Sequence, residues 1–574
     1  MTFDLIIRGG SVVDGTGGPA RTADVAVQAG RIVDIGKITS AAAREISADG
    51  ALVTPGWVDV HTHYDGQVTW DKNLAPSSWH GVTTVVMGNC GVGFAPVHDR
   101  DYDQLIELME GVEDIPGTAL HEGIAWGWQT FPDYLDVLSG LPRDIDFATM
   151  VPHSALRLFV MGERGARREP ATPDDIESMG RLAREAVEAG ALGFSTDRLA
   201  MHRTSRGEHT PAFGSAHNEC VSIAAEMGRS GTGVLQAVLE FDPLEDELEL
   251  LRSMIKASGR PLSFTLTYRQ NDAGRVLNRR ILEFVASANA DGQHLVGQVA
   301  PRAIGFLYGL QCTLNPFSTN PVFQEIAGLR PEEQARIMGE PGFRHRLLTT
   351  EDRISSTAIG AEKVEFFERM FELADPPDYE PDITQSIAAR AAQLGRSPQD
   401  LVLDIMIKDD GRGMLYVPGV NYRDGNLDVV GEMLAHRYTI PGLSDGGAHV
   451  GTICDASYPT TLLEYWGRDR ERGKLDVPFI VQRQCRDTAW FFGLRDRGVL
   501  APGYRADINV IDFQRLRLRR PEVRFDLPTG GRRLLQRAEG YLHTVVNGEE
   551  TYRDGAPAGQ LPGRLVRGAQ PAPA

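Results

Sequence analysis

Short apolar runs alternate with amphipathic stretches through the middle of the chain. The apolar runs have the length of buried strands, and between them apolar residues recur every three to four positions, as on one helix face. Helices are predicted at 174–188, 245–257 and 275–288. Strands are predicted at 58–61, 83–87, 147–151, 192–194, 233–239, 262–267, 294–299 and 438–443. Because strand–helix alternation generates parallel strands, the pattern predicts an α/β fold of the (β/α)8 TIM barrel type, with its active site at the carboxyl ends of the strands.

The two ends of the chain follow a different pattern. The first fifty residues read as short strands separated by glycine turns, and strand patterns return near the other end, at 508–512 and 541–547. We predict that residues 1–55 and 496–574 together form a small β-sandwich domain, and that 56–495 form the barrel. The stretch 302–436 is long and mostly helical, so it is predicted to be an insertion in the seventh barrel loop.

Composition and charge narrow the functional classes. The chain has 574 residues, of which 59 are basic and 78 acidic, for a net charge of −19. This balance argues against nucleic acid and anionic membrane surfaces as partners. Five scattered cysteines form no disulfide framework, and the sequence has neither a signal-peptide pattern nor a long apolar run. We therefore expect a cytoplasmic protein that acts on small molecules, with a homo-oligomer compatible with the sequence.

The first barrel strand ends in His61-Thr62-His63. Residues two apart on a strand point to the same side, so both imidazoles can reach one metal ion where the strand opens into a cleft. Imidazole is a good ligand for zinc, copper, nickel and iron. Two surface histidines on a turn would be the alternative, but Pro-Gly, an apolar strand and His-x-His in that order favour a metal site.

Two further candidate groups follow other strands. Cys90 stands in Gly-Asn-Cys-Gly after the second strand, where a thiolate could bind or bridge metal; the alternative is a small buried apolar residue. Asp445 follows the last strand, where a carboxylate could bind metal and take a proton from water, or merely stabilise a turn. His449 could be a ligand, a substrate contact or a structural residue. The histidines at 202, 209 and 217 fall in an irregular polar stretch and are interpreted as solvated loop residues.

These motifs resemble the amidohydrolase superfamily, and within it the D-aminoacylase (N-acyl-D-amino-acid deacylase) family. The matching segments include 5–10, 13–17, 55–63, 88–91, 190–196, 444–446, 501–507 and 561–564. The resemblance implies a barrel with a terminal β-sandwich and metal-dependent hydrolysis of an amide. It also implies that His61 and His63 are the paired ligands, Cys90 the cysteine ligand of this branch, and Asp445 the catalytic aspartate.

The sequence departs from the family at two strand ends. The family carries further histidine ligands after strands five and six, but here the segments 235–240 and 263–269 contain no histidine. Of one or two zinc ions, a single zinc at His61, His63 and Asp445, with Cys90 as a fourth ligand, is therefore favoured. Arg269, in the altered segment, could meet a substrate carboxylate.

Three functions follow from this set of residues. We predict a metal-dependent amidohydrolase that deacylates an N-acyl (D-)amino acid or a related small amide. The altered strand ends leave hydrolysis of a cyclic amide, such as a hydantoin or lactam, as an alternative. The missing histidines also leave a non-catalytic scaffold relative, although such a protein would not need the retained pair of histidines and the aspartate.

Overall fold

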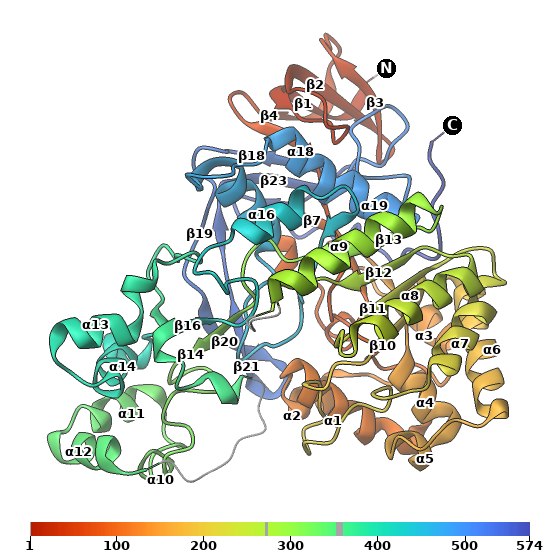
Figure 1. Ribbon diagram of the computed structural model, residues 1–574. Helices are drawn as coiled ribbons and strands as arrows, with labels where there is room; N and C mark the ends of the chain where they lie inside the picture. Colours follow the sequence, from red (N-terminus) through yellow and green to blue (C-terminus); the bar gives the residue numbers. More distant parts are fainter. Residues whose placement is uncertain (1, 270–273, 352–359, 574) are drawn as a thin grey trace.

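The computed structural model describes residues 2–269, 274–351 and 360–573. Its fold is α/β, as predicted, with parallel strands in the interior and helices packed outside them (Figure 1). Each predicted barrel strand overlaps a strand of the structure. A three-stranded parallel sheet contains β6 (Trp57–Asp59), β7 (Val82–Met87) and β8 (Asp146–Thr149). A six-stranded parallel sheet contains β9 (Val151–Pro152), β10 (Gly193–Asp197), β11 (Val234–Val238), β12 (Leu262–Thr265), β13 (Leu295–Val299) and β17 (Thr439–Pro441).

The two parallel sheets adjoin each other at both edges. Only Met150 separates β8 from β9. At the other edge Thr62 forms a parallel bridge with Gly446, and His63 N–H donates to the Gly446 carbonyl at 2.8 Å. The segments that follow the first and the last strand are therefore side by side.

Helices connect the strands, as α6 (Pro173–Ala189) illustrates. Thr172 and Asp175 form a capping box at its start, with Pro173 in the first turn. Its buried residues recur every three to four positions, which gives the helix one apolar face. The other helices of this part are α1 (Tyr102–Glu113), α2 (Gly117–Gly123), α3 (Phe131–Ser139), α4 (His153–Met161), α5 (Glu163–Ala166), α7 (His217–Gly228), α8 (Leu244–Ser258) and α9 (Gly274–Ala290). Among the described residues, no helix is long and apolar enough to cross a membrane.

Both ends of the chain contribute to one nine-stranded sheet. Its N-terminal strands are β1 (Phe3–Val12), β2 (Arg21–Gln28), β3 (Arg31–Gly36), β4 (Ala42–Ser47) and β5 (Leu52–Pro55), and its C-terminal strands are β18 (Ile508–Ile511), β23 (Tyr541–Val546), β24 (Glu549–Arg553) and β25 (Ala556–Pro557). The two groups join where β18 pairs antiparallel with β5. Residues of both groups, among them Leu5, Val53 and Ile508, share one apolar core.

Not all of the C-terminal segment lies in that sheet. The pairs β19 (Arg517–Leu518) with β22 (Ala538–Glu539), and β20 (Glu522–Leu527) with β21 (Gly531–Leu535), extend away from it (Figure 1). Farther on, Leu565 forms a parallel bridge with Phe147 of β8. The C-terminal residues thus also contact the parallel strands.

Between β13 and β17 the chain forms a largely helical unit. It contains β14 (Gly305–Tyr308), α10 (Pro321–Gln324), α11 (Pro331–Met338), α12 (Pro341–Thr349), β15 (Phe371–Glu372), α13 (Ile387–Leu394), α14 (Pro398–Met406), α15 (Lys408–Gly411), β16 (Leu415–Pro418) and α16 (Asp428–Ala435). Most of these elements have an apolar core of their own, with Phe323, Met338, Leu403 and Met406 among its members. They lie to one side of the parallel strands (Figure 1). After β17 come α17 (Tyr458–Thr461), α18 (Val477–Val481) and α19 (Thr488–Phe491).

Candidate metal centre

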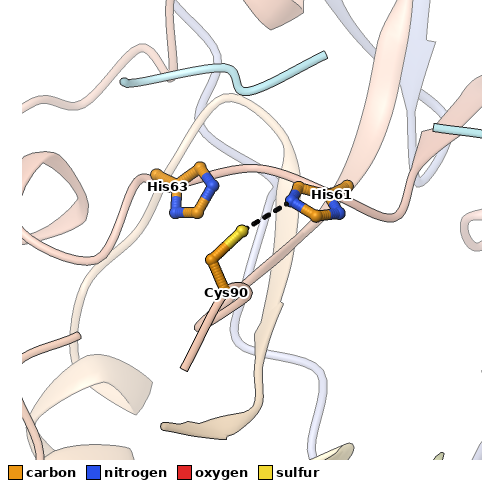
Figure 2. A group of neighbouring side chains, drawn as sticks. All are labelled: His61, His63 and Cys90. Atoms are coloured by element: carbon orange, nitrogen blue, oxygen red, sulfur yellow. Dashed lines mark hydrogen bonds between the residues drawn. The ribbon is translucent and has the colours of Figure 1, made fainter. Parts of the chain in front are cut away.

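His61, His63 and Cys90 form a compact group beyond the ends of β6 and β7. One possible ligand atom from each lies within 4.8 Å of the others, and the three residues are 1%, 1% and 6% exposed. The two rings and the thiol point into the same space, with His61 Nε2 3.2 Å from Cys90 Sγ (Figure 2). The predicted pairing of the histidines with Cys90 is thus present in the structure. Two imidazole nitrogens and a sulfur are a donor set that suits zinc.

The backbone around Cys90 explains how its thiol turns inward. Cys90 has a φ of +53°, and Gly88 and Gly91 beside it also have positive φ. A Cβ on Gly88 would collide with the backbone of Met150, so glycine is required at this close approach. Cys90 N–H donates to the side-chain oxygen of Gln236 at 3.1 Å, which fixes the turn against β11.

Hydrogen bonds orient the His61 ring. Its Nδ1 donates to Gln298 Oε1 at 2.6 Å, while Gln298 Nε2 donates to Ser263 Oγ at 3.0 Å. The amide therefore presents its oxygen to His61, which leaves Nε2 with a free lone pair. Burial lowers the pKa of His61 to about 4, so the ring is neutral, as a metal ligand must be.

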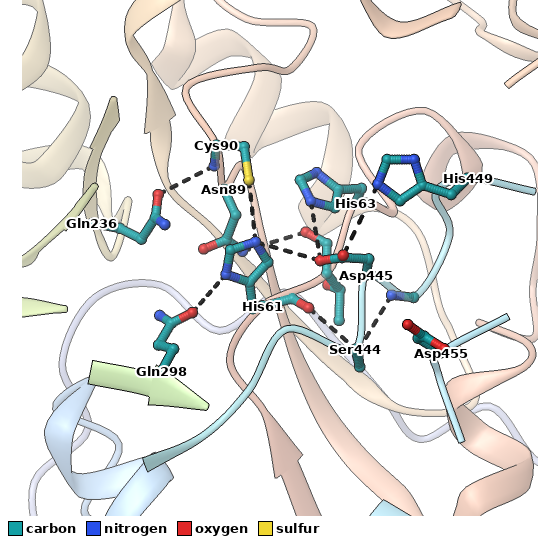
Figure 3. A network of polar contacts seen from close by, with 12 residues as sticks. His61, His63, Asn89, Cys90, Gln236, Gln298, Ser444, Asp445, His449 and Asp455 are labelled. Carbon is teal, nitrogen blue, oxygen red and sulfur yellow. Dashed lines mark hydrogen bonds and ion pairs between the residues drawn. The ribbon is translucent and has the colours of Figure 1, made fainter. Parts of the chain in front are cut away.

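Asp445 lies beside both histidines, as predicted. Its Oδ1 is 3.5 Å from His61 Nε2 and 3.7 Å from His63 Nε2 (Figure 3). Burial alone would raise the pKa of Asp445, but the adjacent imidazoles, His63 above all, hold it below its usual range. The carboxylate is therefore ionised and able to bind a cation or accept a proton.

The sequence analysis missed a second carboxylate, Glu113. It is 1% exposed, and its two oxygens lie 3.2 Å from His63 Nδ1 and 3.5 Å from His449 Nε2. Glu113 ends α1 and follows Met109 by four positions, which places it on the buried face of that helix. The sequence could have indicated this residue, because an acidic side chain falls at a position that belongs to the apolar face of this helix.

Burial shifts the pKa values of His63 and Cys90, the two other titratable groups of the cluster, in opposite directions. It lowers the pKa of His63, but Glu113 and Asp445 outweigh burial and raise it to about 9. Burial and the same two carboxylates raise the pKa of the Cys90 thiol well above its usual value. Negative charge thus surrounds the cluster, which is an environment that favours a cation.

His449 and Arg269 also line the cavity at this site, although their settings differ. His449 Nε2 lies 3.9 Å from Asp445 Oδ2 as well as close to Glu113, so this side chain belongs to the polar cluster. Arg269 forms an ion pair with Glu240 at 3.1 Å and donates to the backbone carbonyl of Glu240. A substrate carboxylate would therefore compete with Glu240 for Arg269.

The cluster opens into a cavity of about 290 Å³. Its polar lining residues are His61, His63, Cys90, Glu113, His202, Glu240, Thr265, Thr267, Arg269, Lys363, Asp445 and His449. Its apolar wall contains Leu199, Val238, Leu239, Phe241, Leu277, Ile281, Ile304, Phe306, Val420, Leu443 and Ile453. The polar groups of the cluster therefore line a cavity whose wall is mostly apolar.

The interpretation of the loop histidines is wrong for His202. This side chain is buried in the cavity wall, whereas His209 is partly exposed and stacks on Phe213 with ring centroids 4.1 Å apart. His217 begins α7 and is exposed. The polar sequence around position 202 concealed a side chain that folds back over the strands.

Comparison with known proteins identifies the family. Residues 44–552 match a sequence model of the amidohydrolase family. This chain belongs to the amidohydrolase family. It is 26% identical to a D-aminoacylase of Alcaligenes xylosoxydans xylosoxydans over 98% of this chain and 97% of that protein. An uncharacterized Mycobacterium tuberculosis protein is 28% identical, over 89% and 85% of the two chains.

Solved structures agree with this assignment. A crystal structure of a D-aminoacylase superposes with a TM-score of 0.65 at 26% identity, covering 98% of this chain and all of that one. An N-acyl-D-glutamate deacylase from Bordetella bronchiseptica, at 22% identity, has a TM-score of 0.63 over 99% of this chain and all of that one, which shows the shared fold. The resemblance to the D-aminoacylase branch is thereby confirmed.

In this amidohydrolase, Gln236 and Thr265 are among the residues of the two segments that lack histidine. Gln236 on β11 binds the Cys90 backbone, and Gln298 on β13 binds His61. Thr265, at the end of β12, lines the cavity, and its buried hydroxyl has no hydrogen-bond partner within the described part of the chain. These side chains support or border the cluster, and none replaces an imidazole as a zinc ligand.

Proposed function

We propose that this amidohydrolase cleaves the carbon–nitrogen bond of a small amide, and that its substrate is an N-acyl D-amino acid. One observation carries the proposal: His61, His63, Cys90 and Asp445 meet in the wall of a largely apolar cavity. The full-length similarity to a D-aminoacylase supports the acyl-amino-acid class and the D configuration.

The proposed cofactor is a single zinc ion held by His61, His63 and Asp445, with Cys90 as fourth ligand. Nitrogen, oxygen and sulfur donors in this number fit the tetrahedral preference of zinc. The absence of imidazole at the ends of β11 and β12 favours one ion over two. When bound, zinc polarises the scissile carbonyl and lowers the pKa of water.

The residues of the chain supply the remaining chemistry. Gln298 holds His61 in the tautomer that offers Nε2. Asp445 remains ionised, so it can accept a proton from the attacking water and deliver it to the leaving nitrogen as the carbon–nitrogen bond breaks. The apolar wall excludes water and favours a substrate whose acyl group or side chain is apolar.

The architecture belongs to the same proposal. We propose that the eight parallel strands close as a barrel over residues 56–495, with 302–436 as its insertion, and that 1–55 and 496–574 form a β-sandwich domain. The bridge between Thr62 and Gly446 supports closure, and the pairing of β5 with β18 supports a shared terminal domain. Five free, buried cysteines and the acidic net charge favour a cytoplasmic enzyme of small molecules.

The first test combines zinc content with a substrate panel. Zinc-loaded protein would be assayed against N-acyl D- and L-amino acids with apolar or acidic side chains, and against hydantoins. We expect about one zinc per chain and hydrolysis of N-acyl D-amino acids. Cys90→Ser should bind zinc more weakly, whereas Cys220→Ser, which changes a buried cysteine on α7, should not.

The other outcomes separate the alternatives. If the protein opened the hydantoin ring but did not hydrolyse linear N-acyl amino acids, the result would favour the cyclic-amide function. Hydrolysis of neither class by zinc-loaded protein would refute the proposed reaction. Protein that binds no zinc, cobalt or manganese would instead support a non-catalytic scaffold.

A further inference from the structure

The loop after β10 buries a histidine in the cavity wall, although the polar sequence of this loop predicts a solvent-exposed side chain. His202 lies between Met201 and Arg203, which are both exposed, yet it is only 9% exposed itself. Its ring lines the same cavity as His61 and Asp445. A polar ring that is folded into a reaction chamber can contact whatever occupies the chamber.

Asp197 fixes the orientation of this ring. Asp197 ends β10, is fully buried, and has one oxygen 3.0 Å from His202 Nδ1. Its other oxygen accepts the Leu199 N–H at 2.8 Å, so the carboxylate is itself held in place. Burial would lower the pKa of His202, but Asp197 outweighs burial and raises it. The buried carboxylate 3.0 Å from Nδ1 favours the imidazolium form of His202, in which both ring nitrogens carry a proton.

The second nitrogen of the ring remains available. Within the described residues, His202 Nε2 has no hydrogen-bond partner, whereas the arginine and the lysine of the cavity lining are ion-paired: Arg269 with Glu240 at 3.1 Å and Lys363 with Glu362 at 2.6 Å. The compact metal-binding group of the described residues contains His61, His63 and Cys90 without His202. These observations favour a hydrogen-bond donor over a further ligand.

We propose that His202 is a catalytic residue that donates a hydrogen bond from Nε2 to the carbonyl oxygen of the scissile amide, and that Asp197 is its positioning residue. As the water oxygen bonds to the carbonyl carbon, the π electron pair moves onto the carbonyl oxygen, and the hydrogen bond from Nε2 strengthens. His202 keeps its proton throughout. The electron pair returns when the carbon–nitrogen bond breaks and Asp445 protonates the nitrogen. This inference rests on the proposed function.

The test compares variants of two histidines in one loop. His202→Leu removes the donor, His202→Gln retains an N–H donor, and His209→Leu changes the partly exposed histidine as a matched control. With the best N-acyl amino acid of the panel, we expect kcat of His202→Leu to fall about 100- to 1,000-fold with little change in KM. His202→Gln should recover part of the loss, and His209→Leu should behave as wild type.

Asp197→Asn tests the positioning role separately. The amide weakens the charge that holds the imidazolium, so we expect a smaller loss of kcat than for His202→Leu. Zinc content and thermal unfolding of every variant would be measured alongside the rates. Because neither group is a proposed ligand, zinc content should stay at the wild-type value.

Several results would overturn the inference. An unchanged kcat in His202→Leu would make the ring a passive part of the wall. A rise in KM alone would make it a substrate-carboxylate anchor, and loss of zinc would make it a ligand. A wild type that hydrolyses no amide would refute the proposed function itself, whereas an active wild type with unaffected His202 variants would refute only this inference.

Discussion

Charged groups are buried at two places in this molecule, and they are balanced very differently. Beside the amino end of β8, Asp146 binds Arg497 at 2.7 Å and Arg505 at 2.9 Å, and these arginines also bind Asp496 and Asp507. Beyond the carboxyl ends of the strands, Asp445 and Glu113 instead face imidazoles and a thiol. Charges pair with permanent cations in the first region and with titratable, metal-binding groups in the second.

The difference distinguishes buried charges that stabilise the fold from buried charges that serve a functional site. The arginines at 497 and 505 lie between the last helix and the terminal sheet, so their contact with Asp146 joins the C-terminal segment to the parallel strands. The second region leaves buried polar atoms of His63, Glu113 and His449 without hydrogen-bond partners among the described residues. In the first region Arg505 Nε and Asp507 Oδ2 also lack a hydrogen bond, but they form an ion pair with each other at 3.2 Å. Ion pairs between permanent charges stabilise one arrangement, whereas imidazole nitrogens and carboxylate oxygens of the second region are available to a cation or a substrate.

The largest effect should follow from changing Asp445 in the second region. Asp445→Asn removes the proton acceptor while keeping the shape of the side chain, so we expect kcat to fall about 100- to 10,000-fold. Because the histidines hold the pKa of Asp445 below its usual range, its carboxylate stabilises the fold near neutral pH, and the metal-free variant should unfold at a lower temperature. Steady-state rates and calorimetry would check this. Wild-type activity in the variant would show that another group moves the proton.

Asp146→Asn makes the corresponding change in the first region. It leaves two buried arginines with less opposing charge, and breaking a buried ion pair costs about 3–5 kcal/mol. Denaturant unfolding should show this decrease in the free energy of unfolding. The variant protein that remains folded should keep the wild-type kcat. Asp136→Asn, which breaks an exposed ion pair with Arg567 in the same C-terminal segment, is the control and should have little effect. A large loss of kcat at full stability would contradict the structural assignment.

A pH experiment compares Asp146, which is ion-paired with two arginines, with the nearby Asp144, whose hydrogen-bond partners are neutral. Asp144 accepts hydrogen bonds from Leu74 N–H and the Tyr552 hydroxyl, and burial raises its pKa to about 6, above the usual 3.8. Because the folded pKa is the higher one, the stability that Asp144 contributes is complete below pH 3.8 and is lost as pH rises through 6. The pKa difference corresponds to about 3 kcal/mol.

The measurement is the free energy of unfolding of wild type and Asp144→Asn between pH 4 and 7. Asparagine does not titrate, so the variant should gain about 2 kcal/mol relative to wild type between pH 4 and 7, since part of the change lies below pH 4. Asp136→Asn again provides the exposed control. If the free energies of unfolding of wild type and Asp144→Asn changed in parallel with pH, the pKa of the Asp144 carboxyl would not be raised in the folded protein.

The sequence was sufficient for the parts of the site that follow strands. His61, Cys90 and Asp445 come directly after apolar runs, and carboxyl ends of parallel strands meet at one edge of the fold, so these side chains were predicted to meet. The full list of strand positions followed from the same periodicity. Local patterns therefore determined both the elements and the residues at their ends.

The remaining groups depend on packing that local patterns do not encode. Glu113 reaches the site because α1 ends over the strands, and His202 because its loop turns back onto Asp197. The network of Asp146 joins residues more than 350 positions apart in the chain. For a loop or a long-range ion pair, hydrophobic periodicity gives no position, so such contacts emerge only from the folded chain.

The smallest effect, and the sharpest probe of the second region, concerns Gln298. It touches no proposed substrate, but its oxygen fixes the His61 tautomer. Gln298→Leu should weaken zinc binding about 10- to 100-fold, whereas Gln298→Glu keeps an acceptor and should bind more tightly than the leucine variant. Competition with a chromogenic chelator would measure both affinities. Equal zinc affinity in wild type and Gln298→Leu would mean that His61 needs no orientation from β13, and that the second region owes its metal affinity to the ligands alone.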